Sequence, residues 1–339
     1  MSPLEQVVRA TIKAHPVSPA EICISIVIPA LNEEKMIGRC LESLTRLAFA
    51  SDRFEVLVVD NGSSDKTLII AESFKNRMNV KILQQTDVRI SVLRNLGARE
   101  AMGDIVAFLD ADCLAPPDWL DRIVALSSGD GTGIFGAHYL LPEDSSWVGR
   151  TWHRYQEAPK SGEVSHVPAG DLIMRREDFL KLGGFDETIQ TNEDYELCDR
   201  ARKAGMHVQA FPQIGVIHLG TAQSLPVFFR KQAWHGTHVV KVFLRDVFKS
   251  HNRKAVFFAA YTLLSMSAVI ACATWTLARH GSWWGLVTAT TALCLPPIAL
   301  SVRNVLSSRR YSDFFPLFAL YLTYGIARAK ALLSVKNFI

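Results

Sequence analysis

The stretch Gly103–Asp118, with the sequence GDIVAFLDADCLAPPD, decides how this chain folds. Its first part, Ile105–Leu109, is a short apolar run of the kind found in strands that are buried on both faces of a sheet. The run ends abruptly in two acids, Asp110 and Asp112, whose side chains point the same way if the backbone stays extended. Two carboxylates at the edge of an apolar sheet repel each other unless a cation lies between them. We therefore expect a hard divalent ion that holds an anionic substrate here, although Asp112 could instead cap the turn before the two prolines.

Short apolar runs alternate with helical patterns through the first two thirds of the chain. The runs that resemble strands are Ile24–Pro29, Phe54–Val59, Val80–Leu83, Ile105–Leu109, Ile134–Leu140 and Phe211–Ile217. The helical patterns begin at Asn32, after Asp65, around Arg94, near Arg176 and at Thr191. Alternating strands and helices of this length predict an α/β fold, in which helices cover both faces of a mostly parallel sheet.

The carboxyl ends of the predicted strands form the expected ligand-binding edge, because open α/β sheets bind ligands in the crevice beyond those ends. Asp60 and Asp110 both lie there. An acid that ends the second strand would also suit a dinucleotide-binding fold, but the first turn, Pro29–Glu33, has none of the glycines that let backbone approach a pyrophosphate. A nucleotidyltransferase is disfavoured for a similar reason, because no glycine-rich triphosphate loop follows the first strand.

The last third of the chain carries most of its unusually high hydrophobic content, which is 49% overall. Ala255–Ala278 is a run of 24 residues without a charge, and Gly281–Val302 is another of 22 residues. Each is long enough to cross a hydrocarbon core of roughly 30 Å. The third run, Phe314–Ala327, has only 14 residues and contains Pro316, so we expect a re-entrant or interfacial helix there.

The distribution of charge predicts how these helices lie in the membrane. Basic residues flank the two long runs on their outer sides, whereas the short connection between them holds only Arg279 and His280. A hairpin whose basic flanks face the cytoplasm follows from the positive-inside rule. No secretory signal opens the chain, and the six cysteines have no CxxC spacing, so we expect a multi-pass protein of the cytoplasmic membrane whose soluble part stays in the cytoplasm. The net charge of +4 is then explained by the basic residues that orient the membrane helices, and we expect no nucleic-acid partner.

A basic and aromatic segment precedes the first predicted crossing. Residues 225–254 contain seven basic residues and one acid, interleaved with large apolar side chains. This mixture is typical of a helix that lies on an anionic membrane surface. The sequence thus divides into an N-terminal segment 1–21, a catalytic domain 22–224, an interfacial segment 225–254 and a membrane region 255–339.

Four motifs together resemble the family 2 glycosyltransferases of the GT-A fold, over roughly residues 22–236. The motifs are the acids that end the strands, Arg94-Asn95-Leu96-Gly97, Gly183-Gly184-Phe185-Asp186 and Glu193-Asp194. Each is weak alone, but their order and spacing are specific. The resemblance implies an inverting glycosyltransferase that moves a sugar from a nucleotide sugar, with UDP as the preferred carrier, to an acceptor such as a lipid-linked or cell-surface glycan intermediate.

The resemblance also implies a role for individual residues. On the donor side, Pro29, Asn32 and Glu33 would border the nucleotide, Asp60 would accept a hydrogen bond from the base, and Arg94 would lie near the diphosphate or sugar. A Mn or Mg ion would be held by Asp112 and Asp110, the latter also touching ribose, with His218 as a further ligand or a structural residue. On the acceptor side, Asp194 would be the catalytic base with Glu193 beside it, and the remaining candidates are Gly183, Gly184 and Trp234. The two glycines could equally be a helix C-cap, and Trp234 a membrane anchor.

Two departures from related patterns narrow the function. Polymer-making members carry Gln-x-x-Arg-Trp, whereas this chain has Arg230-Lys231-Gln232-Ala233-Trp234 and lacks the arginine before the tryptophan, which argues against processive synthesis. The residues after Asp112 also differ from those of the polyprenyl-phosphate sugar synthases. Synthesis of a polyprenyl-phosphate sugar is therefore kept only as the alternative to the function given above. An alternative of another class is a membrane scaffold that binds nucleotide without catalysis, which the four intact acids disfavour.

Overall fold

The computed structural model describes residues 24–127, 133–157, 161–189, 192–245, 253–279 and 283–334. The expected N-terminal segment 1–21 lies outside these residues. The chain divides into two compact units. The first contains residues up to 142 together with 159–220, and the second contains residues 143–158 together with those from 221 onward. The second unit therefore includes a short segment that interrupts the first unit in the sequence.

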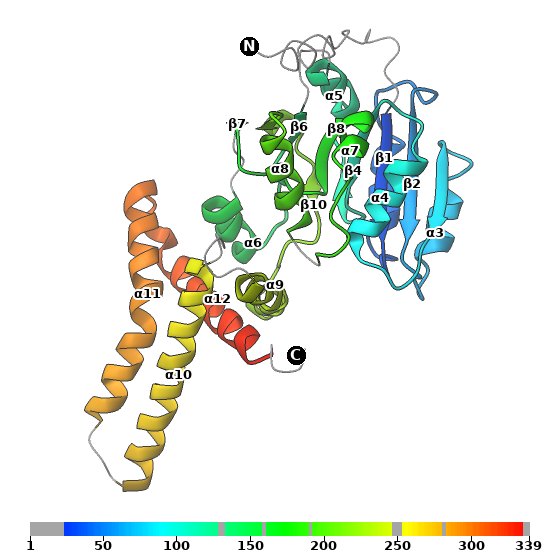
Figure 1. Cartoon of the computed structure of the whole chain (residues 1–339). Coiled ribbons are helices and arrows are strands. Elements are labelled where there is room, and N and C mark those ends of the chain that lie inside the picture. Colours follow the sequence, from blue (N-terminus) through cyan, green and yellow to red (C-terminus); the bar gives the residue numbers. More distant parts are fainter. Residues whose placement is uncertain are drawn as a thin grey trace, which may run out of the picture. The chain divides into compact units, whose positions relative to one another are not determined.

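The first unit is built on a mixed sheet, which has eight strands within the described residues (Figure 1). In spatial order these are β3 (Val80–Gln84), β2 (Phe54–Asp60), β1 (Ile24–Ala30), β4 (Ile105–Leu109), β8 (Asp171–Arg175), β6 (Gly133–Gly136), β9 (His207–Ala210) and β7 (Gly162–Glu163). A separate antiparallel pair joins β5 (Cys113–Leu114) to β10 (Ile217–His218).

The first four strands share one direction, and this decides where polar side chains gather. β1 pairs in parallel with both β2 and β4, and β2 pairs in parallel with β3. β8 then runs antiparallel to β4. In the register of β1 and β2, Ala30 lies opposite Asp60. The carboxyl ends of β1, β2 and β4 therefore meet at one edge of the sheet, as the sequence predicts.

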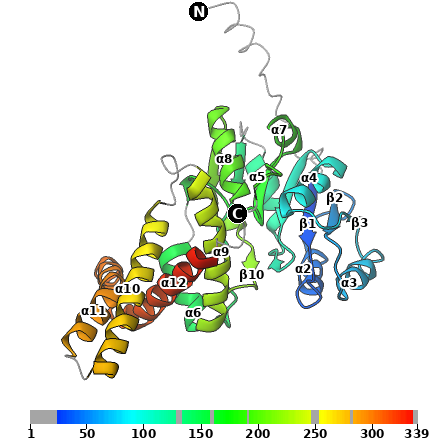
Figure 2. The same cartoon turned by 60° about the horizontal axis from the view of Figure 1, so that its bottom comes forward.

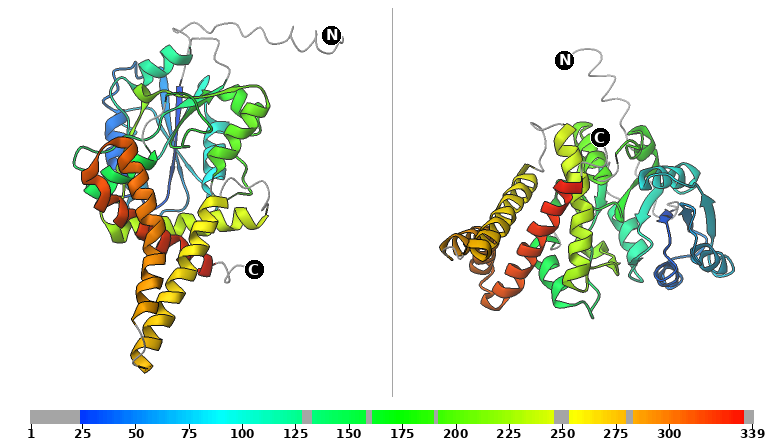
Figure 3. Two further views of the ribbon diagram at one scale, coloured as in Figure 1. Left: turned by 90° about the vertical axis from the view of Figure 1, so that its left-hand side faces the viewer. Right: turned by 90° about the horizontal axis from the view of Figure 1, so that it is seen from below.

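Helices cover both faces of this sheet (Figure 3, left). Side chains alternate along β1, so Ile26 packs with the helices on one face and Val27 with those on the other. The first core includes side chains of α2 (Ile37–Leu44), α3 (Thr67–Ser73) and α5 (Trp119–Ser127). The second core includes side chains of α4 (Ile90–Glu100), α7 (Arg176–Lys181) and α8 (Glu193–Lys203). The predicted α/β architecture is confirmed.

The second unit is helical within the described residues. Its elements are α6 (Trp147–Trp152), the π-helical turn η1 (His153–Glu157), α9 (Leu225–Arg245), α10 (Arg253–Arg279), α11 (Trp284–Ser308), the short η3 (Tyr311–Asp313) and α12 (Phe314–Ser334). α10 and α11 form a long hairpin, while α12 packs against α9, α10 and α11 (Figures 1 and 2). By length and composition, Lys254–Ala278 and Trp284–Ser308 could each cross a membrane.

The structure corrects the sequence analysis at two places near the sheet edge. The helix expected from Asn32 begins at Ile37, because Asn32 has a left-handed backbone with φ of 55° and forms part of a turn. The expected strand Phe211–Ile217 is broken. Pro212 opens a 3₁₀ turn, η2 (Pro212–Ile214), since proline has no backbone N–H to donate to a strand. The regular pairing lies instead in β9 before the turn and in β10 after it.

A close approach between α4 and the sheet generates the first prediction. A Cβ atom at Gly97 would collide with Val27 and approach Val59, so we expect Gly97→Ala to destabilise the first unit by about 1–3 kcal/mol through overpacking. Hydrogen exchange of the β1 and β2 peptides in the full chain measures this loss. Gly38→Ala, in α2, is the matched control, because its Cβ would meet only a methyl group of Ile70 at 3.3 Å. Equal protection in the two variants would contradict the packing argument.

Candidate active site

The candidate site lies at the edge where the parallel strands end. Asp60 is the last residue of β2, and Asp110 directly follows β4. Pro29 is buried within β1, one residue before its end. Asp112 lies in the turn that leads from β4 into β5, and the half-buried His218 is the last residue of β10. The structure thus brings residues from five strands to one edge of the first unit.

Asp60 organises the first loop of this edge. Its side chain is fully buried, and Oδ2 accepts hydrogen bonds from the backbone N–H groups of Gly62 and Ser63, each at 2.9 Å. The Ser63 hydroxyl donates to the other carboxylate oxygen and accepts from the N–H of Asn32 at 2.9 Å. The Asn32 side chain in turn accepts from the N–H of Ser64 at 2.9 Å. Asp60 therefore ties the loop after β2 to the loop after β1, a structural role that it holds independently of any nucleotide.

Arg94 joins three segments that are far apart in the sequence. Its side chain projects from α4 and is 3% exposed. Nη2 lies 2.7 Å from Oδ1 of Asp110, and Nη1 lies 2.7 Å from Oε1 of Glu193. Burial by itself would lower the pKa of Arg94, but the two carboxylates outweigh burial and hold this pKa above its ordinary value. Arg94 is therefore a permanent cation that fixes the end of β4 against the start of α8.

Asp110 has a second partner that sequence analysis missed. The hydroxyl of Tyr139 donates a hydrogen bond to its Oδ2 at 2.8 Å. The Tyr139 ring also stacks on His218, with ring centroids 4.7 Å apart, and His218 Nε2 lies 3.2 Å from Oδ2 of Asp112. Tyr139 thus connects the two acids of the central motif. In the sequence it lies within an ordinary strand-like run, and only the return of the chain beside β10 brings it to the site.

Two glycines make room for these carboxylates. A Cβ at Gly170 would collide with the carboxylate of Asp110 and the hydroxyl of Tyr139. A Cβ at Gly220 would likewise collide with the carboxylate of Asp112. Backbone therefore passes directly over both acids, and a side chain at either position would displace them.

Glu193 and Asp194 begin α8 on the other side of Arg94. Burial raises the pKa of Glu193. The charge of Arg94 lowers this pKa, and the neighbouring charge of Asp194 raises it further. Burial also raises the pKa of Asp194, and the charge of Asp110 adds to this effect. A carboxylate whose pKa lies above its ordinary value is a better proton acceptor than an exposed one. This pair therefore has the electrostatics of a general base.

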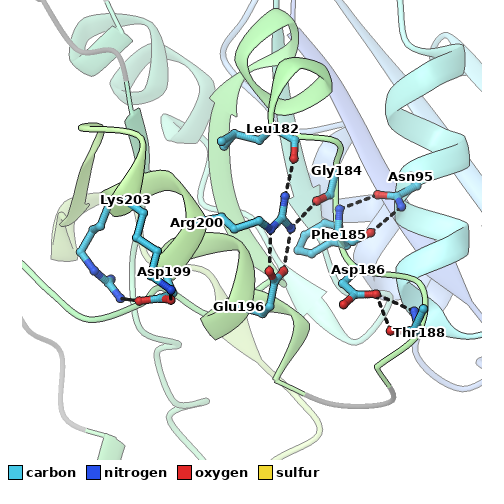
Figure 4. A network of polar contacts seen from close by, with 11 residues as sticks. Asn95, Leu182, Gly184, Phe185, Asp186, Thr188, Glu196, Asp199, Arg200 and Lys203 are labelled. Atoms are coloured by element: carbon cyan, nitrogen blue, oxygen red, sulfur yellow. Dashed lines mark hydrogen bonds and ion pairs between the residues drawn. The ribbon is translucent and has the colours of Figure 1, made fainter. Parts of the chain in front are cut away.

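The loop between α7 and α8 is held by a dense set of polar contacts (Figure 4). Gly183 and Gly184, with φ of 84° and 71°, end α7, and the N–H of Gly184 donates to the carbonyl of Phe179 in the manner of a glycine C-cap. Arg200 of α8 donates to the carbonyl of Gly184 at 2.6 Å and pairs with Glu196. From the other side, Asn95 of α4 receives the N–H of Phe185 and donates to its carbonyl, each at 2.8 Å. Arg200 and Asn95 were not among the predicted site residues, yet they position this loop.

The remaining predicted residues are Glu33 and Trp234. The half-buried Glu33 follows β1, where its N–H donates to the hydroxyl of Thr67 at 2.7 Å. Trp234 belongs to the second unit, where it lies on α9 with 58% of its surface exposed. Its ring makes an edge-on contact with His235. The acceptor-side role of Trp234 stays a prediction.

The donor set at this edge fits a metal only in combination with a substrate. Among the described residues, no three His, Cys, Asp or Glu side chains form a cluster that could hold a metal ion. Both oxygens of Asp110 are engaged by Arg94 and Tyr139, while Asp112 and His218 offer one carboxylate and one imidazole. Magnesium is commonly bound by one or two carboxylates together with substrate phosphates. The residues present therefore suit a divalent ion whose coordination a diphosphate completes.

Comparison with known proteins places this geometry in a class. The structure resembles that of Mannosyltransferase PcManGT from Pyrobaculum calidifontis, solved in complex with GDP-Man and Mn2+, with a TM-score of 0.59 and 18% identity. The match covers 98% of this chain and 94% of that one. The likeness shows the fold: a mostly parallel, mixed α/β sheet of the GT-A type, with C-terminal helices that follow it in the sequence.

The sequence comparisons identify the family. The profile of Glycosyl transferase family 2 matches residues 25–183. Glycosyltransferase AglE of Haloferax volcanii is 28% identical over 229 residues, which are 66% of this chain and 75% of that protein. Validoxylamine A glucosyltransferase of Streptomyces hygroscopicus subsp. jinggangensis is 37% identical over 219 residues, or 54% of this chain, and the chain spans about half (52%) of its length. Residues 25–183, just under half of the chain, therefore match the family 2 glycosyltransferase profile, as the four motifs indicated, and the protein is a glycosyltransferase.

The buried cation generates the second prediction. We expect Arg94→Met to lower the free energy of unfolding by about 3–5 kcal/mol, because two carboxylates lose their countercharge. In this variant the folded-state pKa of Glu193 rises further above the ordinary 4.5, so the folded chain holds a proton that the unfolded chain releases. Stability should therefore fall as the pH increases above about 4.5. Scanning calorimetry of the full chain between pH 5 and pH 8 measures both effects.

Arg46→Met is the control for this measurement, since Arg46 forms an ion pair with Glu42 but its side chain is 71% exposed. Its loss should cost less than about 1 kcal/mol and show little dependence on pH. A similar cost for the two substitutions would mean that Arg94 is not the organising cation.

Proposed function

We propose that the protein is an inverting, metal-dependent glycosyltransferase that moves one sugar from a nucleotide sugar to a hydroxyl acceptor at the cytoplasmic membrane face. The observation that carries the proposal is the link from Asp110 through Arg94 to Glu193. It supports a site in which a donor-binding acid and a candidate base are held at fixed positions around one cation. UDP is preferred as the nucleotide through family resemblance, and a lipid-linked or cell-surface glycan intermediate as the acceptor.

On the donor side, the protein must stabilise a departing nucleoside diphosphate. Asp60 and Asp110 lie at the strand ends, where the base and ribose would bind. Arg94 would reach the donor only through Asp110, which it orients. A divalent ion held by Asp112, Asp110 and His218 would, when bound, neutralise the negative charge on the diphosphate and make it a better leaving group.

On the acceptor side, a hydroxyl becomes a competent nucleophile when a positioned carboxylate takes its proton. Asp194 is our candidate for this base, with Glu193 held beside it by Arg94. The raised pKa of Asp194 supports this assignment. No second candidate nucleophile stands out in the sequence, so a single displacement, which inverts the configuration at the sugar carbon, is the simpler mechanism.

The helices of the second unit support action at a membrane. Two of them are long and apolar enough to cross it, and basic residues flank the hairpin at the ends that would face the cytoplasm. A transferase tethered in this way would meet acceptors that are themselves in the membrane. Release of the protein from membranes by alkaline carbonate, without detergent, would contradict the attachment.

The third prediction tests the catalytic assignment. We expect Asp112→Asn and Asp194→Asn each to reduce the release of nucleoside diphosphate by about 10²–10⁴-fold, because one disables the metal site and the other removes the base. Screening UDP- and GDP-sugars with Mn or Mg, against membrane extracts as acceptor source, provides the assay. Asp199→Asn is the control, since Asp199 lies on the same helix as Asp194 but pairs with Lys203 at 2.6 Å on its exposed face.

Two results would count against this proposal. Full activity in the presence of a strong chelator would show that the reaction does not require a divalent metal ion. Tight nucleotide binding together with turnover no greater than background, across all donors and acceptors, would favour a binding scaffold instead.

The fourth prediction concerns pH. A base must be ionised to accept a proton, so activity should fall as the pH decreases through the pKa of Asp194. Because burial raises this pKa above the ordinary 3.8, the acidic limb of kcat should lie at a higher pH than an exposed aspartate would give. Steady-state rates between pH 4 and pH 9 measure the limb. It should be unchanged in Asp199→Asn, whereas a wild-type limb at or below the ordinary value would exclude Asp194 as a buried base.

A further inference from the structure

The second unit contains a cavity of about 620 Å³ that the sugar-transfer chemistry does not use. Its walls come from five elements: the end of α6, η1, the start of α10, the end of α11, and α12. Aromatic side chains form much of the wall, including Trp152, Tyr155, Tyr321 and Tyr324. The cavity is therefore a built feature of this unit, assembled from segments that are far apart in the sequence.

The charges on the wall have one sign. Lys254, Arg303 and Arg328 line the cavity, and no Asp or Glu does so among the described residues. None of the three cations forms an ion pair with a carboxylate in the part of the chain that the structure describes. The nearby acid Asp313 is already bonded to Arg154 at 2.7 Å and to Tyr155 at 2.9 Å. The cavity thus has an uncompensated positive charge that suits an anionic ligand.

Arg328 is the most deeply placed of these cations. Its Nη2 donates to Gln232 at 3.0 Å, and its guanidinium lies over the ring of Tyr324 at 4.8 Å. Its buried Nε and Nη1 atoms have no hydrogen-bond partner within the described residues. Burial lowers the pKa of this arginine, and no carboxylate in the described part of the chain opposes that effect. Arg328 therefore contributes a positive charge to the wall of the cavity.

The position of the cavity along the hairpin indicates where such a ligand comes from. Lys254 is the first residue of one candidate span, and Arg303 lies near the end of the other, so both are at the same end of the hairpin. Cations and aromatic rings at the end of a membrane helix lie at the level of the lipid headgroups. At the level of the headgroups, phosphate groups are supplied by the membrane lipids themselves.

We propose that this cavity binds the phosphate group of an anionic membrane lipid. Arg303, Arg328 and Lys254 pair with the phosphate oxygens, the tyrosines and Asn304 surround the headgroup, and the hydrocarbon chain follows the apolar surfaces of α10 and α11. The inference rests on the membrane attachment proposed above, but not on the transferase reaction. It gives the second unit a recognition function in addition to anchoring.

The experiment titrates the full-length protein in detergent micelles with dioctanoyl phosphatidic acid and counts bound lipid by native mass spectrometry. We expect one saturable site, with dioctanoyl phosphatidylcholine at least tenfold weaker and millimolar inorganic phosphate unable to compete. Arg303→Gln and Arg328→Gln should each weaken binding about tenfold, as expected for one charge-assisted hydrogen bond. Arg310→Gln should change binding less than twofold, because Arg310 is exposed at the same end of the hairpin but does not line the cavity.

Three outcomes would overturn the proposal: equal weakening by Arg310→Gln, equal affinity for phosphatidylcholine, or displacement by inorganic phosphate, which would indicate a site for free phosphate. If Arg328→Gln fails to fold, Lys254→Gln and the exposed Arg303→Gln carry the test. No sugar donor is present in this assay, so its failure would leave the transferase proposal intact. A chain that is soluble without detergent would instead contradict the membrane attachment.

Discussion

The first unit depends on a guanidinium buried between two carboxylates. An isolated charge in a protein interior is very costly, so Arg94 is stable there only because Asp110 and Glu193 each lie 2.7 Å away. The same geometry requires that α4 lie very close to the sheet, since a longer gap would pull the guanidinium away from the end of β4. Gly97 meets this requirement. It is three residues along from Arg94, on the same side of the helix, and its missing side chain lets α4 approach Val27 and Val59 directly. Arg94 and Gly97 therefore work together: the glycine lets α4 approach the sheet, and the arginine can then reach Asp110 at the end of β4.

The two acids of the central motif, Asp110 and Asp112, have different surroundings. Asp110 is bonded on both oxygens, by Arg94 and by Tyr139. Burial and the charge of Asp110 raise the pKa of Tyr139 well above its ordinary value, so its hydroxyl keeps its proton and remains a donor. Asp112 instead pairs with His218, whose ring stacks on that same tyrosine. Asp110 is thus held on both oxygens, while Asp112 has an imidazole beside it, which supports our proposal that Asp112 contributes more directly to the metal site than Asp110 does.

The sequence predicts the parts of this arrangement that depend on local patterns. Apolar runs identify the strands β1 to β4, and the change from apolar to acidic residues marks the edge where Asp60 and Asp110 lie. What it misses depends on contacts between distant segments. Tyr139 reaches Asp110 because its neighbour Leu140 bridges to Ile217 of β10, which in turn pairs with β5, and these pairings are too short to leave a periodic signal. Arg200 likewise looks like an ordinary surface residue of a helix, although it holds the loop between α7 and α8 through the carbonyl of Gly184. Local periodicity identifies elements, whereas the partners of a polar side chain follow from topology.

Basic residues in the second unit illustrate the same limit. The positive-inside rule counts every lysine and arginine near a membrane helix alike, because it concerns the cost of moving charge across a bilayer. The structure distinguishes them. Arg309 and Arg310 are exposed after the end of α11, whereas Arg303 lines a cavity with Arg328, which is reached only through the fold of α12. A basic residue that only sets the orientation of a membrane helix needs neither a precise position nor a hydrogen-bond partner. The cations that line the cavity need a precise placement, because residues of α10, α11 and α12 must bring them together. The exposed arginines therefore meet a requirement of membrane orientation alone, whereas Arg303 and Arg328 also supply positive charge to the cavity for which we propose an anionic lipid ligand.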